Sequence, residues 1–183
     1  LVNTVKTAQQ VYDNIKSFGT DARVMLFHSR FSAERRKEIE QECLRLFGPD
    51  HQNRPDKAIL VATQVVEQSL DIDFDAMITE LAPIDLLLQR MGRLHRHEDT
   101  IRPKKLSRPV LDIHLPSGND FGVSGILYHP LFMKRTTDLL HSISRIVMPG
   151  DIPELVNQVY QPDLLDDMEM ENWLKQQFDT DMM

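Results

Sequence analysis

Short, wholly apolar runs that alternate with helical patterns are the feature that most constrains how this chain folds. Two runs stand out, the wholly apolar Val24–Phe27 and Ala58–Thr63, which is apolar up to its final threonine, and weaker strand candidates follow at Ala76–Glu80 and Val110–Leu115. A strand this apolar is typical of a parallel sheet that is buried on both faces. Because helical segments and short connections separate the four runs, the sequence predicts an α/β domain with a parallel sheet and right-handed crossovers.

Helical patterns fill the intervals between these strands. The first helix follows Leu1–Val5, which we expect to be the end of a strand in a piece of a longer protein, and it stops at Gly19. Its apolar face consists of Ala8, Val11, Tyr12, Ile15 and Phe18. Ser32 is expected to cap a second helix that runs to about Phe47.

The pattern changes after Pro116, where we place a domain boundary. Gly118, Gly122 and Gly125 indicate a loop, and helices are expected over the ranges Leu131–Ile146, Ile152–Val159 and Met168–Phe178. The sequence therefore predicts one α/β domain over residues 1–116 and a small helical appendage with an acidic tail over residues 117–183.

Charge is unevenly distributed along the 183 residues, whose formal net charge is −7. The stretch Asp151–Met183 holds nine acidic residues and one basic residue, whereas Gln89–Arg108 holds seven basic and two acidic residues. Because the acidic residues gather in the tail and a basic segment precedes it, the negative net charge does not exclude an anionic partner. The single cysteine, Cys43, excludes an intrachain disulfide and favours a reducing, cytoplasmic location. No apolar run is long enough to span a membrane.

The segment Ile84–His97 carries the most informative cluster of basic residues. If it is helical throughout, Gln89, Arg93 and Arg96 share one face, opposite an apolar stripe. Two guanidinium groups on one face repel each other unless an anion lies between them, and arginine matches phosphate oxygens well. A solvated basic helix face is the simpler interpretation of two such arginines, but the pattern Gln-Arg-x-Gly-Arg-x-x-Arg favours phosphate recognition.

Two further segments follow the apolar strands. Val61–Asp75 ends in the alternating acids Asp71, Asp73 and Asp75, but Ala76 and Ala82 stand where a calcium-binding loop requires Gly and Glu. We therefore expect no metal site, and we assign Asp73 and Asp75 to a loop or capping role. His95 and His97 have no cysteine or acid at metal-ligand spacing either. The other segment is the loop Phe27–Ser32 at the end of the first internal strand.

These segments resemble three motifs of superfamily-2 helicases. The fourth motif corresponds to Phe27–Ser32, the fifth to Val61–Asp75 and the sixth to Gln89–Arg96. The sixth-motif resemblance implies that Arg93 and Arg96 reach the γ-phosphate of ATP held by a sister domain, with Gln89 nearby. The fifth implies that Thr63 contacts the nucleic-acid backbone and that Asp71 faces the ribose, although Ser69 replaces the glycine of many relatives. The fourth places His28, Ser29 and Arg30 along the path of the nucleic acid.

The ensemble of motifs, together with Tyr128–Leu131 and Met148–Val156, resembles the type I CRISPR-associated helicase–nuclease over roughly Leu1–Tyr160. The resemblance implies a second RecA-like domain within a larger protein that also holds an HD nuclease, a first RecA-like domain and a C-terminal domain. It further implies ATP with magnesium, bound mainly by the first RecA-like domain. Such a protein translocates on single-stranded DNA and degrades it after recruitment by an RNA-guided surveillance complex, in antiviral defence.

The chain lacks a Gly-x-x-x-x-Gly-Lys-Ser/Thr phosphate loop and an Asp-Glu-x-His/Asp box, so we expect it to be an inactive half of the motor on its own. Two alternatives remain at this point. The chain could be half of another superfamily-2 DNA or RNA helicase, or a non-catalytic RecA-like module that only binds a partner.

Overall fold

The computed structural model describes residues 1–50, 54–67, 70–118 and 120–161. The chain divides into two compact units, each described here by itself. The first unit contains Leu1–Glu80 and Gln89–His114, and the second contains Leu81–Leu88 and the residues from Leu115 onward. The boundary expected at Pro116 stays a prediction, because the second unit also takes in a segment from before it.

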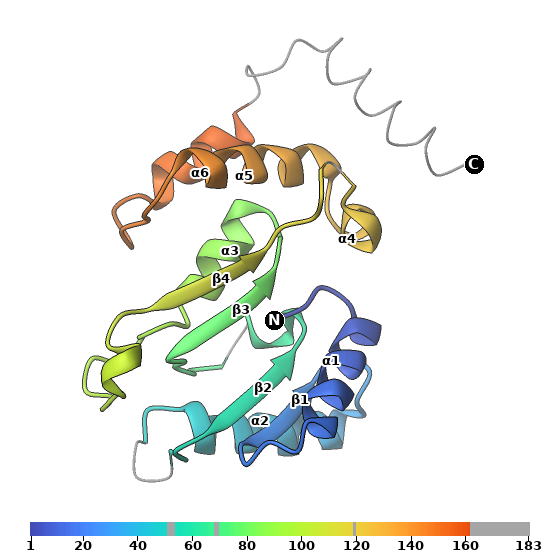
Figure 1. Cartoon of the computed structure of the whole chain (residues 1–183), viewed down its shortest axis with the longest axis vertical. Coiled ribbons are helices and arrows are strands. Elements are labelled where there is room, and N and C mark those ends of the chain that lie inside the picture. Colours follow the sequence, from blue (N-terminus) through green and yellow to red (C-terminus); the bar gives the residue numbers. More distant parts are fainter. Residues whose placement is uncertain (51–53, 68–69, 119, 162–183) are drawn as a thin grey trace. The chain divides into compact units, whose positions relative to one another are not determined.

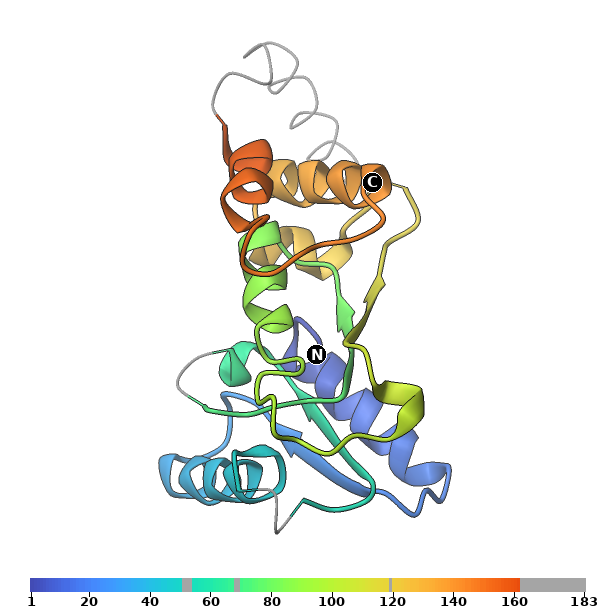
Figure 2. The same ribbon diagram turned by 90° about the vertical axis from the view of Figure 1, so that its left-hand side faces the viewer.

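The first unit is a parallel α/β arrangement, as the sequence predicted. Its elements run in the order α1 (Val5–Ser17), β1 (Arg23–Phe27), α2 (Ala33–Phe47), β2 (Ala58–Ala62), η2 (Gln64–Val66), β3 (Ala76–Glu80), η3 (Lys104–Leu106) and β4 (Val110–His114). Strand β1 pairs in parallel with β2, and β3 with β4, so the strands form two parallel pairs. Helices α1 and α2 lie on opposite faces of the β1–β2 pair (Figure 2).

The segment Leu1–Val2 lies between β2 and β3 (Figure 1). The Val2 amide donates to the Ala62 carbonyl at 3.0 Å, and the Glu80 amide donates to the Leu1 carbonyl at 3.0 Å. These bonds connect the two strand pairs, but the strand expected over Leu1–Val5 is wrong as stated. Val5 already begins α1, because Thr4 caps the helix and accepts a hydrogen bond from the Thr7 amide.

Packing of α2 against the first strand pair forms the hydrophobic core of this unit. Ser32 caps the helix as expected, and Ile39, Cys43 and Phe47 follow at helical spacing and are buried. The sheet side contributes Phe27 and Ala62. Cys43 is wholly buried, and burial raises the pKa of its thiol to about 12, which makes it a core residue rather than a nucleophile.

Several sequence expectations differ from the structure. Strand β1 is only partly buried, whereas burial on both faces was expected. Phe18, placed on the apolar face of the first helix, follows its last residue and is 85% exposed. The loop expected around Gly122 is helical, since Gly122–Leu127 forms α4.

The second unit is helical. It contains the first residues of α3 (Ile84–Met91), then α4, α5 (Pro130–Ser142) and α6 (Ile152–Tyr160). The Arg135 guanidinium donates to the Val159 and Gln161 carbonyls at 2.8 and 2.9 Å, which satisfies acceptors at the end of α6. The helix expected at Met168–Phe178 lies outside the described residues.

Candidate functional site

The end of α3 decides how the predicted arginines are presented. The helix stops at Met91 instead of continuing to His97, so Arg93 and Arg96 lie in the turn that follows it. This turn is anchored to the start of β3, because the Phe74 amide donates to the Arg93 carbonyl at 2.8 Å and the His95 amide to the Phe74 carbonyl at 3.1 Å. The single helix face expected for Gln89, Arg93 and Arg96 is therefore wrong. Gln89 alone belongs to α3, where it is exposed.

His95 adopts a left-handed backbone conformation, with φ of 49°. Non-glycine residues rarely occupy this region, and such residues concentrate at functional sites. A 3.1 Å contact between His95 Nε2 and the Asp75 carbonyl oxygen holds the residue in place.

Arg93 is held close to the fifth-motif segment. Its Nη2 donates to the Glu67 carbonyl at 2.9 Å, while its Nε is buried without a hydrogen-bond partner among the described residues. Burial lowers the pKa of Arg93, and the neighbouring positive charge of Arg96 lowers it further. The site thus contains a buried donor and a like-charge repulsion, both of which a bound anion would relieve.

Arg96 lies beside Asp71, the residue predicted to face the ribose. Its Nε donates to Asp71 Oδ1 at 2.8 Å, and both side chains are nearly half exposed. The His97 Nε2 lies 3.2 Å from the same oxygen. An exposed pair of this kind contributes little to stability, so the Arg96 side chain can exchange Asp71 for another anion at small cost.

The carboxylate of Asp73 fixes the backbone of Arg96. Asp73 is wholly buried and accepts hydrogen bonds from the Arg96 amide at 2.8 Å and from the Thr100 hydroxyl at 2.7 Å. Arg102 donates to Asp73 at 2.5 Å and also to Asp75. Burial alone would raise the pKa of Asp73, but the hydrogen bonds from Thr100, Arg102 and Arg96 together hold it below its ordinary value. Asp73 lies in a loop and accepts a backbone amide, as expected, but it also forms a buried charge cluster with Arg102 that sequence reasoning did not foresee.

The two strand-end loops predicted to contact nucleic acid lie next to each other. The Thr63 amide donates to the Phe27 carbonyl at 3.1 Å, which joins the ends of β1 and β2. Thr63 and His28 are each only 3% exposed, and His28 stacks on Phe31 with ring centroids 4.2 Å apart. Burial lowers the pKa of His28.

Ser29 and Arg30 are exposed, in contrast to His28 and Thr63. Of the four residues, these two offer an accessible surface to a ligand.

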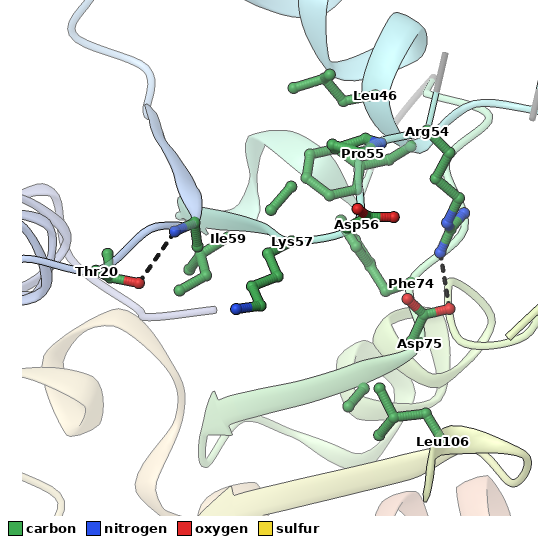
Figure 3. Close-up of a pocket in the computed structure, with 14 residues that line it drawn as sticks. Thr20, Leu46, Arg54, Pro55, Asp56, Lys57, Ile59, Phe74, Asp75 and Leu106 are labelled. Carbon is green, nitrogen blue, oxygen red and sulfur yellow. Dashed lines mark hydrogen bonds and ion pairs between the residues drawn. The ribbon is translucent and has the colours of Figure 1, made fainter. Parts of the chain in front are cut away.

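A pocket of about 420 Å³ lies elsewhere in the first unit, at the amino ends of β2 and β3 (Figure 3). Ala58, Ala76 and Leu106 contribute to its wall, and the Arg54–Asp75 ion pair of 2.8 Å lies at its side. None of the predicted site residues lines this pocket. The described residues contain no group of three or more His, Cys, Asp or Glu arranged to hold a metal ion, and no helix among them is long and apolar enough to cross a membrane.

A comparison with protein families identifies the family to which this chain belongs. The sequence model described as "CRISPR-associated nuclease/helicase Cas3, C-terminal" matches residues 1–99, which include all eight predicted site residues. The chain belongs to this Cas3 family. The match therefore decides against the alternative that the chain is half of another superfamily-2 helicase.

Curated Cas3 proteins match the chain over most of its length. The CRISPR-associated endonuclease/helicase Cas3 of Thermus thermophilus is 46% identical over 75% of this chain, and that of Escherichia coli is 38% identical over 93%. The matched region is 15% of the first relative and 19% of the second. The chain therefore spans less than a fifth of the length of these two proteins.

Solved structures of the family share the fold. The crystal structure of T. fusca Cas3 superposes with a TM-score of 0.83 at 38% identity, covering 96% of this chain and 22% of that one. Structures of the same protein titled with ADP, ATP and AMPPNP match equally well. A chain from a structure titled "CRISPR RNA-guided surveillance complex, pre-nicking" matches with a TM-score of 0.78 at 37% identity over 96% of this chain and 23% of that one.

Replacing Asp73 tests whether the buried cluster holds the turn. Asp73→Asn removes the charge that Arg102 contacts, and we expect it to lower the free energy of unfolding by about 3–5 kcal/mol at neutral pH. Because the folded-state pKa of Asp73 lies below the unfolded value of about 3.9, its contribution is present above that pH and is lost as the pH falls through the folded pKa. The measurement is urea unfolding of both proteins from pH 3 to pH 7.

Asp71→Asn is the matched control, since Asp71 is about half exposed and should cost no more than about 1 kcal/mol. Equal costs for the two variants, or a cost for Asp73→Asn that does not shrink below pH 4, would contradict the role assigned to the cluster.

Proposed function

We propose that this chain is the second RecA-like half of a Cas3 motor, in which Arg93 and Arg96 act on the γ-phosphate of ATP bound mainly by the first half. The observation that carries the proposal is the anchored turn after α3. It fixes Arg93 through the Glu67 carbonyl and the Arg96 backbone through Asp73. Among the described residues Arg93 Nε has no hydrogen-bond partner, and the Arg96 side chain is 43% exposed, so both guanidinium groups can receive an oxyanion. Guanidinium groups held in this way stabilise the charge that develops during phosphoryl transfer.

The residues present fit a phosphate-bearing nucleotide. Arg93 Nε is a donor without an acceptor in the described part of the chain, and the repulsion between Arg93 and Arg96 decreases when an anion enters. Gln89 and Asp71 are exposed beside this turn and are the side chains we assign to the nucleotide's other polar groups. ATP supplies the phosphoryl group, and magnesium is proposed to bind with it on the first RecA-like domain.

The nucleic-acid side of the proposal uses the loops at the carboxyl ends of β1 and β2. Single-stranded DNA is proposed to lie along Ser29 and Arg30, which are exposed. The buried His28 and Thr63 are proposed to shape this path, since His28 supports Phe31 and the Thr63 amide joins the two strand ends. Phosphate contacts of this kind carry no sequence preference, which suits a translocating motor.

The whole protein is proposed to couple this motor to an HD nuclease and to act on DNA presented by a CRISPR RNA-guided surveillance complex. Two findings support this: the names of the relatives, and the match to a chain in a surveillance-complex structure. A non-catalytic binding module is disfavoured, because such a module has no use for two anchored arginines that repel each other.

Alanine substitution of the arginines tests the proposal in the full-length protein. Arg93→Ala and Arg96→Ala should each lower the kcat of DNA-stimulated ATP hydrolysis by about 10³–10⁵-fold, the range known for an arginine finger. Affinity for single-stranded DNA should stay within about twofold, because these side chains face the nucleotide. Arg108→Ala, an exposed arginine of the same basic segment, is the control. Collapse of DNA affinity with preserved turnover is the outcome that would refute the assignment.

The salt dependence of DNA binding tests the Arg30 contact. Removing one phosphate contact should reduce the slope of log affinity against log salt concentration by about 0.7 for a single strand. We therefore expect Arg30→Ala in the full-length protein to show this reduction, measured by fluorescence anisotropy at several salt concentrations. Arg45→Ala is the control, since Arg45 lies in the last turn of α2 and pairs with Glu42. An unchanged slope for Arg30→Ala would remove Arg30 from the DNA path.

A further inference from the structure

Arg90, in the last turn of α3, is wholly buried, and the hydrogen-bond partners of its side chain described below all belong to the first unit. Its Nε donates to Glu67 Oε1 at 2.7 Å, and its Nη1 donates to the Thr79 hydroxyl at 2.6 Å and the Glu80 carbonyl at 3.0 Å. Its Nη2 donates to Asn3 Oδ1 at 3.2 Å. A single guanidinium therefore holds the segment before α1, the end of β3 and the fifth-motif segment.

A buried ion pair of this kind is weak support for stability alone. Desolvation of both charges offsets much of their attraction, and well-packed apolar residues often replace such pairs without loss. What the planar guanidinium fork does provide is orientation, because it fixes the direction of each partner that it binds. The Glu67 side chain, only 4% exposed, is held in this way.

Glu67 is bound at both ends. Its carboxylate accepts from Arg90, while its backbone carbonyl accepts from Arg93 Nη2 at 2.9 Å. The Arg93 amide also donates to the Arg90 carbonyl at 2.9 Å, which closes a ring of contacts through the three residues. The position of the Arg93 guanidinium therefore depends on where Arg90 places Glu67.

We propose that Arg90 is a positioning residue for phosphoryl transfer: it orients Glu67 so that the Glu67 carbonyl holds Arg93 in the reactive geometry. This inference rests on the proposed function of Arg93. Arg90 is wholly buried and therefore not accessible to nucleotide or DNA, so its loss lowers kcat and leaves the KM for ATP and the affinity for single-stranded DNA unchanged. Misplacement of a reacting group by about 1 Å can cost about 10²-fold in rate, which sets the expected size of the effect.

The test uses the full-length protein with Arg90→Lys, which keeps the charge but not the fork. We expect a loss in kcat of about 10²-fold. Arg135→Lys is the matched control, because Arg135 also holds two carbonyls but belongs to the helical unit, and its kcat should be unchanged. Glu67→Gln keeps a side-chain oxygen that accepts from Arg90, so it should lose less than Arg90→Lys. Glu67→Ala removes that acceptor and should lose about 10²-fold in kcat, so this variant carries the test if Arg90→Lys does not fold. A normal kcat in a folded Arg90→Lys, or in Glu67→Ala if only the Glu67 variants fold, overturns the inference.

A double-mutant cycle separates positioning from general structural support. In an Arg93→Ala background, Arg90→Lys should cause no further loss of kcat beyond about twofold, because the group that it positions is gone. Losses that multiply would show a role independent of Arg93 and overturn the inference while leaving the proposed function intact. If Arg93→Ala alone leaves turnover normal, the proposed function fails, and the inference fails with it. Phosphate release from radiolabelled ATP covers the required range of rates.

Discussion

A fully buried guanidinium is the constraint on which the first unit depends. Arg90 can be accommodated inside the protein only if its donors find acceptors, because an unpaired buried charge is far more costly than any single packing defect. The acceptors come from Asn3, Glu67, Thr79 and Glu80, so the segment before α1, the fifth-motif segment and the end of β3 must converge on Arg90. This convergence determines where α3 delivers the turn that carries Arg93 and Arg96.

A second charge cluster fixes the far side of the same turn. Asp73 binds the Arg96 amide, Thr100 and Arg102, and it is as deeply buried as Arg90. The two clusters hold the backbone of this loop and the Arg93 guanidinium, and they leave the Arg96 side chain as the adjustable part. Arg93 keeps one donor that no described residue satisfies, and Arg96 rests on an exposed carboxylate that another anion can replace. Such pre-organisation suits a group that must meet a charge developing elsewhere.

The strands and most helix ends followed from local physical rules. Wholly apolar runs identified β1 and β2, and capping by Ser32 and termination at Gly19 marked ends that the structure retains, with Gly19 at a φ of 66°. The end of α3 did not follow from periodicity. The apolar stripe continues to Leu94, but the hydrogen bonds of Arg93 and His95 with Phe74 compete with the helix and end it at Met91. Contacts between residues distant in sequence decide such boundaries, and a local pattern does not contain them.

Sequence reasoning identified the exposed charged residues of the candidate site better than the buried charged residues that support it. Arg93, Arg96 and Asp71 lie together, as the motif resemblance implied, although their catalytic roles stay predictions. The burial of the supporting residues Arg90, Asp73 and Arg102 was missed, because a charged residue is normally expected at the surface. One signal was present for Arg90: it stands three residues after Leu87 and four before Leu94, next to the apolar stripe. The partners that make its burial acceptable lie up to 87 positions away.

ATP hydrolysis by separated and recombined parts tests the central claim most directly, namely that this chain supplies the arginines while the nucleotide is held elsewhere. The chain alone should show no hydrolysis above a no-protein control, with or without single-stranded DNA. Mixing it with the preceding part of its full-length protein should restore turnover, and Arg96→Ala in this chain should abolish the restored activity. Hydrolysis by the isolated chain that disappears in Arg93→Ala would contradict the claim, because the chain would then hold the nucleotide by itself.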